Sequence, residues 1–350
     1  MKIKKKYMKN WQNFNFLQIG LGSMGKRRIR NLLFHGVKKE NIFGFDPRKD
    51  RCIEANKKYG INTPNSFKKA LKKTDADAYI ISSPPDTHWP YFLHAARNKK
   101  HFFVEHPTTD RGYKELMGLK GEGFIMAPSC TLRFHPAVKM IKKIIGKKQI
   151  GEILSFQYHL GQYLPSWHPW EDFRKVYFSN KKTGACREMF AFELGWLSHA
   201  LNLQRVSKVF GFTEKLSNLN MSADDAYSAI LKFKDSVIGN IAVDLLSKKP
   251  FRTLRIIGSS GVLQWEWQDN EIKVFDAKNK NWKILKFKKG KSERNYVTTE
   301  DMYEEEIGLF LKAIEDKKPF PFTFQENHHF LKTLFALEKS SKLGKVILVK

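Results

Sequence analysis

Cysteine and long hydrophobic runs are both scarce in this sequence. The 350 residues include three cysteines, Cys52, Cys130 and Cys186, which stand far apart and show neither a CxxC pattern nor a Cys–His spacing. This argues against a disulfide framework and a zinc site, and we expect no bound metal. No apolar run approaches the roughly 20 residues that span a bilayer. We therefore expect a cytoplasmic protein without membrane contact.

Acidic residues are few relative to basic ones. The chain has 35 Asp and Glu against 63 Lys and Arg, a formal net charge of +28 at pH 7. Such a charge can attract nucleic acid, an anionic membrane or a phosphorylated substrate. The lysines recur along the whole chain, often in pairs such as Lys142-Lys143, and cluster only at residues 2–6. We expect no specific nucleic-acid partner and keep nucleic-acid binding as an alternative that rests on charge alone.

The length of the chain and the order of its predicted elements indicate two domains. Short apolar strands alternate with helical patterns up to about residue 130, which predicts an α/β domain with the doubly wound parallel sheet of a Rossmann fold. Later segments alternate in polarity and are separated by turns, which predicts an α+β domain with a large, mostly antiparallel open sheet. We assign residues 1–13 to a basic tail, 14–130 to the Rossmann domain and 131–350 to the second domain, whose C-terminal helix can pack back on the first.

A glycine motif lies between the first predicted strand and helix, Gly20-Leu21-Gly22-Ser23-Met24-Gly25. In a GxGxxG turn the first glycine permits the bend, the second lets the backbone approach a pyrophosphate, and the third allows close helix packing. The helix N-terminus then faces the phosphates. The next predicted strand ends at Asp46, where an acid accepts hydrogen bonds from the adenosine ribose. A dinucleotide cofactor is predicted. Asp46 favours NAD because a carboxylate repels a 2′-phosphate, although NADP stays open because Arg48 can accommodate one.

Segments beyond this motif resemble the Gfo/Idh/MocA oxidoreductases, the glucose-fructose oxidoreductase and inositol dehydrogenase family. Residues 75–88 (DADAYIISSPPDTH) are similar to the family's strand and loop over the nicotinamide, and residues 101–107 (HFFVEHP) occupy the place of its Glu-Lys-Pro signature. Further similarity at residues 131–136, 255–261 and 302–349 extends the resemblance over nearly the whole chain. It implies an NAD(P)-dependent dehydrogenase or reductase acting on CH–OH groups. Beyond the glycine motif and Asp46, the implied cofactor contacts are Ser83, Pro84, His88 and Glu105.

Two positions depart from the family pattern. His106 stands where the family has a lysine near the reacting carbon, and Phe192 stands where a histidine commonly exchanges the substrate proton. Because histidine titrates near neutral pH, His106 is our candidate acid–base residue, with a structural cap as the alternative. Glu188 and Glu193 are candidate assisting carboxylates. They are alternatively an ion-paired scaffold, for which Arg187 is an available partner.

The segment at residues 163–174 resembles a subgroup found in pathways for surface sugars, including sialic-acid-like ones. This resemblance implies a sugar or sugar-nucleotide substrate. Arginine and histidine suit recognition of hydroxyl, carboxylate and phosphate groups, and tryptophan can form either a sugar platform or core. The candidate substrate contacts are Arg133, His135, Trp167, His168 and Arg174. By analogy with the family we expect a homo-oligomer, a dimer or tetramer. The alternative function is a non-catalytic or atypical Gfo-like dinucleotide-binding protein that lacks the usual Lys/His pair.

Overall fold

The computed structural model describes residues 11–119, 123–167, 171–288, 290–292 and 299–350. The predicted substrate contact His168 and the lysine cluster at residues 2–6 lie outside the described residues. The chain divides into two compact units, residues 1–131 with 292–327 and residues 132–291 with 328–350. The sequence assigns residues 292–327 to the second domain, whereas the structure places them in the first unit.

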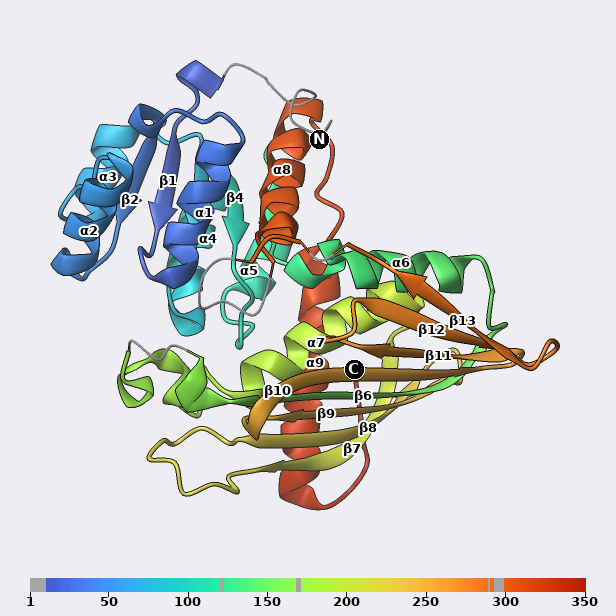
Figure 1. The fold of residues 1–350 in the computed structure, drawn as a ribbon. Helices are drawn as coiled ribbons and strands as arrows, with labels where there is room; N and C mark the ends of the chain where they lie inside the picture. The colour runs from blue at the N-terminus through green and yellow to red at the C-terminus, as the bar shows by residue number, and fades with distance from the viewer. Residues whose placement is uncertain (1–10, 120–122, 168–170, 289, 293–298) are drawn as a thin grey trace. The chain divides into compact units, whose positions relative to one another are not determined.

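The first unit is built on a five-stranded parallel sheet with the order β2-β1-β3-β4-β5. Its strands are short and almost wholly apolar because side chains on both faces are buried under helices;. The strands are β1 (Phe16–Ile19), β2 (Ile42–Phe45), β3 (Ala78–Ile81), β4 (His101–Val104) and β5 (Met126–Pro128). The helices are α1 (Ser23–Phe34), α2 (Lys49–Tyr59), α3 (Phe67–Thr74), α4 (His88–Arg97), α5 (Tyr113–Gly118) and α8 (Glu300–Asp316). The predicted Rossmann sheet is confirmed (Figure 1).

Two segments outside the expected Rossmann range complete this unit. Helix α8 packs against α1 (Figure 1). Arg27 of α1 pairs with Glu300 of α8 at 2.8 Å, and its guanidinium lies over the Tyr303 ring. Near the N-terminus, Trp11 is only 5% exposed and packs edge-on against Phe16, although it falls within the predicted basic tail of residues 1–13. Hydrophobic and ionic contacts between distant segments therefore extend the first unit beyond residues 14–130.

The second unit contains a nine-stranded sheet with the order β13-β12-β11-β10-β6-β9-β8-β7-β14. All neighbouring strands are antiparallel except β6 and β9, which run parallel. This confirms the predicted mostly antiparallel sheet. The strands are β6 (Ile153–Tyr163), β7 (Val206–Glu214), β8 (Ala226–Phe233), β9 (Ile238–Asp244), β10 (Leu246–Gly258), β11 (Gly261–Glu266), β12 (Glu271–Asp276), β13 (Asn281–Lys286) and β14 (Ile347–Leu348).

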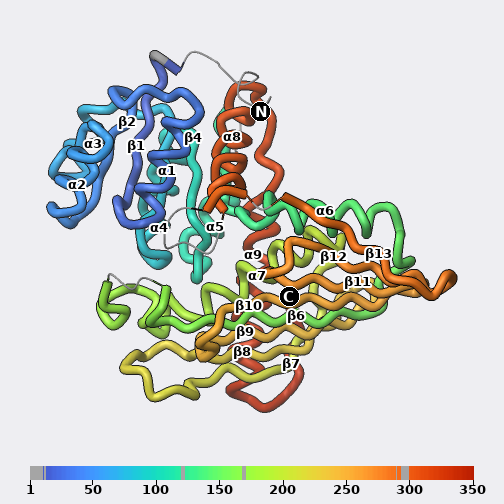
Figure 2. The backbone as a smooth tube through the Cα atoms, in the orientation of Figure 1, coloured from blue at the N-terminus to red at the C-terminus, as the bar shows by residue number. Residues whose placement is uncertain are grey.

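Helices cover one face of this sheet and leave the other open (Figure 2). They are α6 (Pro136–Gly146), α7 (Cys186–Leu201) and α9 (Phe324–Leu343). Tyr158 and Leu160 of β6 point to the helix side and are buried, as period-two alternation requires;. On the strands β7, β8 and β9, Phe212, Ile230 and Ile238 are about half exposed. The predicted open sheet is therefore present, with apolar side chains among its exposed residues.

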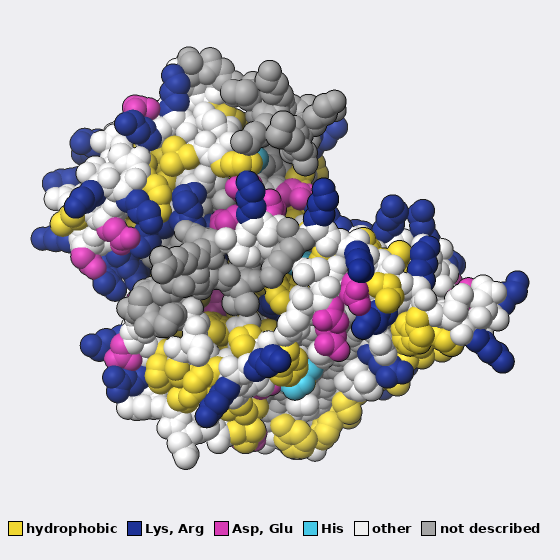
Figure 3. All heavy atoms as spheres, in the orientation of Figure 1, with side chains coloured by type: hydrophobic (Ala, Val, Ile, Leu, Met, Phe, Trp, Pro, Cys, Tyr) yellow, Lys and Arg dark blue, Asp and Glu magenta, His cyan; other side chains and the backbone are white. Residues whose placement is uncertain are grey.

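The described basic side chains on the face drawn in Figure 3 are spread out rather than gathered in one place. On this face, Lys and Arg are scattered over both units and interspersed with Asp and Glu. Many of them pair with nearby carboxylates, as Lys26 does with Glu54 at 2.6 Å. In the part of the chain that the structure describes, none of the helices has the length and apolar character needed to cross a membrane.

Candidate cofactor and substrate site

The glycine motif forms the turn between β1 and α1. Gly20 has a φ of 85°, and its N–H donates to the carbonyl of Phe45 at 2.8 Å. A Cβ at Gly25 would overlap the carbonyl oxygen of Gly20, so only glycine lets the helix start this close to the strand;. Gly22 is the N-cap residue of α1 and has no side chain that could cap the helix. The turn therefore has the features of a phosphate-binding helix N-terminus.

Asp46 follows β2 and is bound to the glycine turn. Its Oδ2 accepts the N–H of Leu21 at 2.8 Å, and its Oδ1 accepts the N–H of Arg48 at 2.9 Å. The guanidinium of Arg51 lies 3.6 Å from Oδ2 and also approaches Gly22. The carboxylate thus shapes the turn in the free protein and sits beside a basic group. Each carboxylate oxygen can still accept a further hydrogen bond, such as one from a ribose hydroxyl.

The loop after β3 carries Ser83, Pro84 and His88. Ser83 is half-buried and Pro84 is exposed. His88 is buried, and its Nε2 lies 2.7 Å from the carbonyl oxygen of Ser83. Because a carbonyl only accepts, this contact places the proton of a neutral imidazole on Nε2. Burial lowers the pKa of His88 to about 4. The histidine therefore acts as a neutral group that fixes the loop.

Glu105 and His106 follow β4 at the carboxyl edge of the sheet. Glu105 donates its backbone N–H to Ile81 at 2.9 Å, which continues the sheet by one residue. His106 is 8% exposed, and burial, together with the neighbouring His88, lowers its pKa to about 3. In the free protein His106 is therefore neutral at pH 7. Its predicted acid–base role remains a prediction, and it would start from the neutral imidazole.

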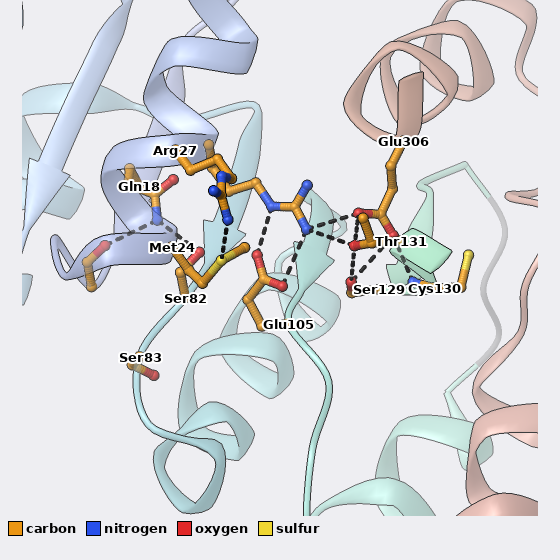
Figure 4. A network of polar contacts seen from close by, with 12 residues as sticks. Gln18, Met24, Arg27, Ser82, Ser83, Glu105, Ser129, Cys130, Thr131 and Glu306 are labelled. Atoms are coloured by element: carbon orange, nitrogen blue, oxygen red, sulfur yellow. Dashed lines mark hydrogen bonds and ion pairs between the residues drawn. The ribbon is translucent and has the colours of Figure 1, made fainter. Parts of the chain in front are cut away.

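A buried polar network surrounds Glu105. The fully buried guanidinium of Arg28 donates to both Glu105 oxygens, at 2.6 and 3.1 Å, and to Glu306 of α8 at 2.8 Å. Glu306 also accepts the N–H of Cys130 and the hydroxyl of Thr131, both at 2.6 Å. Figure 4 shows these residues converging from β4, α8 and the segment after β5. Glu105 is thus held in place by the core of the first unit.

Sequence reasoning missed Arg28 and Glu306. Arg28 lies three residues after Gly25 and four before Leu32, and all three are buried on one face of α1. Such i, i+3, i+7 spacing could have identified it as a buried arginine. Glu306 has no comparable local signal, because its partner Arg28 is 278 residues away in the chain.

In the second unit, Glu193 lies on α7 and is completely buried. Its Oε1 accepts from Arg252 at 3.0 Å, while its Oε2 accepts from the hydroxyl of Tyr158 at 2.6 Å and the indole N–H of Trp196 at 2.5 Å. Both oxygens are therefore engaged within this unit. These contacts match the ion-paired scaffold alternative, with Arg252 as the partner.

The other α7 residues that the sequence singles out are Arg187, Glu188 and Phe192. Arg187 pairs with Glu338 of α9 at 2.6 Å, a contact between helices that the sequence did not suggest. Its side chain reaches α9 because Glu338 lies across the helix interface, which sequence spacing cannot show. Glu188 is half-buried and accepts from the hydroxyl of Tyr177 at 3.1 Å. Phe192, which the resemblance assigns to the position of the family's histidine, is also half-buried.

Two of the predicted substrate contacts, Arg133 and His135, are buried in the second unit. His135 caps α6, because its Nδ1 accepts the N–H of Ala137 at 3.2 Å, and its ring stacks on Trp267 at 4.5 Å. Burial lowers the pKa of His135 to about 3. Arg133 is 7% exposed. His135 therefore has a clear structural role in the free protein.

The two remaining predicted substrate contacts lie in the segment after β6. Trp167 is half-buried and packs edge-on against Phe178, with ring centroids 5.3 Å apart. Arg174 is exposed and forms a bidentate pair with Asp172 at 2.8 and 2.9 Å. Among the residues described, no group of three or more His, Cys, Asp or Glu side chains could hold a metal ion. Of the two predicted contacts, Arg174 thus offers an accessible guanidinium and Trp167 a partly accessible ring.

Two family models match the chain. Residues 14–119 match the model described as an oxidoreductase family with an NAD-binding Rossmann fold, and residues 138–264 match the GFO/IDH/MocA C-terminal domain. Among curated relatives, scyllo-inositol 2-dehydrogenase (NAD(+)) of Bacillus subtilis (strain 168) is 28% identical over 143 residues, 40% of this chain and 42% of the relative. The 2,7-anhydro-N-acetylneuraminate hydratase of Escherichia coli (strain K12) is 28% identical over 145 residues, 40% of this chain and 38% of the relative. The chain thus matches less than half the length of these relatives.

Solved structures share the fold over nearly the whole chain. Levoglucosan dehydrogenase, in complex with NADH and levoglucosan, superposes with a TM-score of 0.80 at 17% identity and covers 96% of this chain and 99% of that one. GenD2 from gentamicin A biosynthesis, in complex with NAD, has a TM-score of 0.78 at 17% identity, with 96% of both chains covered. Identities this low show similarity of fold only. The two family models, which together match residues 14–119 and 138–264, show that this chain belongs to the Gfo/Idh/MocA oxidoreductase family.

Proposed function

We propose that this protein is an NAD(P)-dependent oxidoreductase, with NAD preferred, that acts on a CH–OH group of a sugar or sugar nucleotide. The observation that carries the proposal is the turn between β1 and α1. Gly20 and Gly25 bring strand and helix together, and Asp46 holds Leu21 by its backbone N–H at 2.8 Å. This arrangement is preorganised for a dinucleotide.

The residues at this turn fit a dinucleotide by charge and by shape. The backbone of residues 22–24 begins α1 and would face the pyrophosphate, where the positive end of the helix dipole favours an anion;. Asp46 would accept hydrogen bonds from the adenosine ribose. A bound nicotinamide supplies the hydride acceptor or donor. Binding and orienting the cofactor are therefore the roles we assign to Gly20, Gly22, Gly25 and Asp46.

The protein must also take or give the proton of the substrate hydroxyl. We assign this role to His106, which lies at the carboxyl edge of the parallel sheet, where such folds bind ligands;. Burial and the neighbouring His88 lower its pKa to about 3, so the imidazole is neutral at pH 7 but is a weak base. The assigned role requires that bound substrate and cofactor raise this pKa towards the working pH. Glu188 is the candidate assisting carboxylate, because its side chain is only half-buried. It accepts a hydrogen bond from the hydroxyl of Tyr177. Glu193 is the weaker candidate because both its oxygens are engaged.

The carbohydrate substrate class is supported by the names of similar proteins. A scyllo-inositol dehydrogenase, a levoglucosan dehydrogenase and a hydratase of an anhydro-sialic acid are among them. The finer proposal of surface-sugar or sialic-acid-like metabolism rests on the resemblance of residues 163–174. The expected homo-oligomer also remains a proposal, and half-exposed Phe212, Ile230 and Ile238 on the open sheet are where it would be tested.

Calorimetric titration of the purified full chain with NAD+ and NADP+ tests the cofactor assignment directly. We expect saturable binding, tighter for NAD+. A panel of inositols, anhydro-sugars, sialic acids and sugar nucleotides, followed by absorbance of the reduced cofactor, then tests the substrate class. Turnover should disappear in His106→Ala while NAD+ binding persists. Absence of any saturable cofactor binding would refute the proposed function.

A second candidate, a dinucleotide-binding protein without turnover, is favoured by one observation. Phe192 occupies the position of the family's histidine, and a phenyl ring cannot transfer a proton. This candidate predicts NAD+ binding with no turnover on any member of the panel, and the same turnover measurement distinguishes the two.

A further inference from the structure

Arg28 is the only described residue that contacts both Glu105 and Glu306 through its guanidinium. Its Nε and Nη2 lie 2.6 and 3.1 Å from the two Glu105 oxygens, and Nη2 also lies 2.8 Å from Glu306. The side chain is fully buried, and its guanidinium lies 4.6 Å from the centroid of the Phe103 ring. A planar guanidinium that grips a carboxylate through two donors fixes its orientation as well as its position.

The second carboxylate anchors the guanidinium to another part of the unit. Glu306 is buried on α8 and accepts from Cys130 and Thr131, both at 2.6 Å, just after β5. Burial opposes the charge of Arg28, but the two carboxylates outweigh it and raise the arginine's pKa. Arg28 is therefore a permanent cation. Since it has three donors in use, it cannot turn away from Glu105 without leaving a buried charge uncompensated.

These contacts connect the helix of the glycine turn with the segments that follow two neighbouring strands at the carboxyl edge of the parallel sheet, where such folds bind ligands;. Arg28 lies one turn beyond Gly25 in the helix that begins at the glycine turn, Glu105 follows β4, and residues 129–131 follow β5. All lie within the first unit. We propose that Arg28 is a positioning residue, which holds the Glu105 carboxylate in register with the glycine turn and so sets the affinity for the nicotinamide cofactor. This inference rests on the proposed function.

A matched control exists on the same helix. Arg27 is also buried and also pairs with α8, through Glu300 at 2.8 Å, but none of its described contacts is to Glu105. An Arg27→Met variant therefore weakens the packing of α1 on α8 without releasing Glu105. An effect specific to Arg28→Met then reflects the loss of its contacts with Glu105 and Glu306, and the double-mutant cycle isolates the part that acts through Glu105.

The experiment measures NAD+ binding by calorimetry on the full chain, after thermal melts have shown which variants are folded. For Arg28→Met we expect a Kd raised roughly tenfold or more, because a misplaced binding group loses its aligned contact. Arg28→Lys should lie between this variant and wild type, since lysine keeps the charge but not the two-pronged geometry. Arg27→Met should stay within about twofold of wild type.

A double-mutant cycle with Glu105→Gln separates positioning from general destabilisation. If Arg28 acts through Glu105, adding Arg28→Met to Glu105→Gln should change the Kd by less than about twofold, whereas independent effects would multiply. Wild-type affinity in Arg28→Met, equal losses in Arg28→Met and Arg27→Met, or independent effects in the cycle would each overturn the inference. If Arg28→Met does not fold, Arg28→Lys takes its place in the same cycle. Failure of wild type to bind NAD+ would instead refute the proposed function.

Discussion

Glu193 and Arg252 form a buried ion pair in the second unit, with Oε1 and Nη2 3.0 Å apart and side chains 0% and 8% exposed. Tyr158 and Trp196 donate to the other oxygen of Glu193, and Arg252 lies 4.5 Å from the ring centroid of Trp267. The pair therefore joins α7 to β10, and Tyr158 adds a contact to β6. Aromatic side chains surround these charges. A buried charge of this kind is tolerated only while its partners remain.

We predict that Glu193→Ala destabilises the protein by about 3–5 kcal/mol, because Arg252 would be left as an uncompensated buried cation. Urea denaturation followed by tryptophan fluorescence measures the change. The control is Glu152→Gln, whose salt bridge with Lys148 is exposed, and it should leave the unfolding midpoint unchanged;. A wild-type midpoint for Glu193→Ala would contradict the scaffold role.

The glycine turn predicts that two similar substitutions both impair NAD+ binding but only one of them destabilises the fold. In Gly25→Ala the new methyl group would overlap the Gly20 carbonyl, so both stability and NAD+ binding should be lost. In Gly22→Ala the methyl group meets only the end of the Arg51 side chain, at 3.3 Å, so the protein should fold. NAD+ binding should nevertheless weaken by roughly tenfold, because the methyl group blocks close approach of the pyrophosphate.

Thermal melts and calorimetry on both variants test this contrast. Gly118→Ala serves as the control, since a Cβ there meets nothing within 4 Å. Normal NAD+ affinity in Gly22→Ala would show that the pyrophosphate does not bind against Gly22.

Cofactor preference should depend on the neighbours of Asp46. Its carboxylate disfavours a 2′-phosphate, whereas Arg51, 3.6 Å from Oδ2, would partly offset that repulsion;. We expect Arg51→Gln to weaken NADP+ binding several-fold while NAD+ binding changes by less than about twofold. Paired titrations with the two cofactors measure the effect. An equal loss for both cofactors would show that Arg51 supports the turn rather than discriminating at the ribose.

Buried histidines should make the protein less stable in acid. Burial lowers the pKa values of His106 and His135 to about 3 and that of His88 to about 4, against roughly 6.5 in the unfolded chain;. The unfolded state therefore binds more protons as the pH falls below about 6.5. Stability is fully present above that pH and is progressively lost towards the folded pKa values, by roughly 2 kcal/mol per histidine at pH 5.

Urea titrations at pH 7.5 and pH 5 measure this loss, and His106→Gln isolates one contribution. The variant should lose less stability than wild type between the two pH values, whatever its stability at pH 7.5. Carboxylates that titrate in the same range are common to both proteins and cancel in the comparison. Equal losses would mean that His106 is not held neutral in the folded state.

Local sequence patterns were sufficient to predict the sheet of each unit. The alternation of short apolar strands with helices predicted the parallel sheet, and the period-two polarity of the later strands predicted the open, mostly antiparallel one. The glycine turn was predictable for the same reason, since Gly20, Gly22, Gly25 and Asp46 are close in sequence and their spacing reflects backbone sterics. The parallel pairing of β6 with β9 was not predictable, because strand neighbours are chosen by global packing.

The amino-acid order alone was thus enough to predict the glycine turn and the two sheets, whereas the roles of His106 and Phe192 stay predictions from the family resemblance. The tertiary structure decided which charges pair: Arg28 with Glu105 and Glu306, Arg252 with Glu193, and Arg187 with Glu338. Only tertiary structure could also show that His106 is buried and neutral. Burial and ion pairing are set by residues that are remote in the chain and adjacent in space, so no local pattern encodes them.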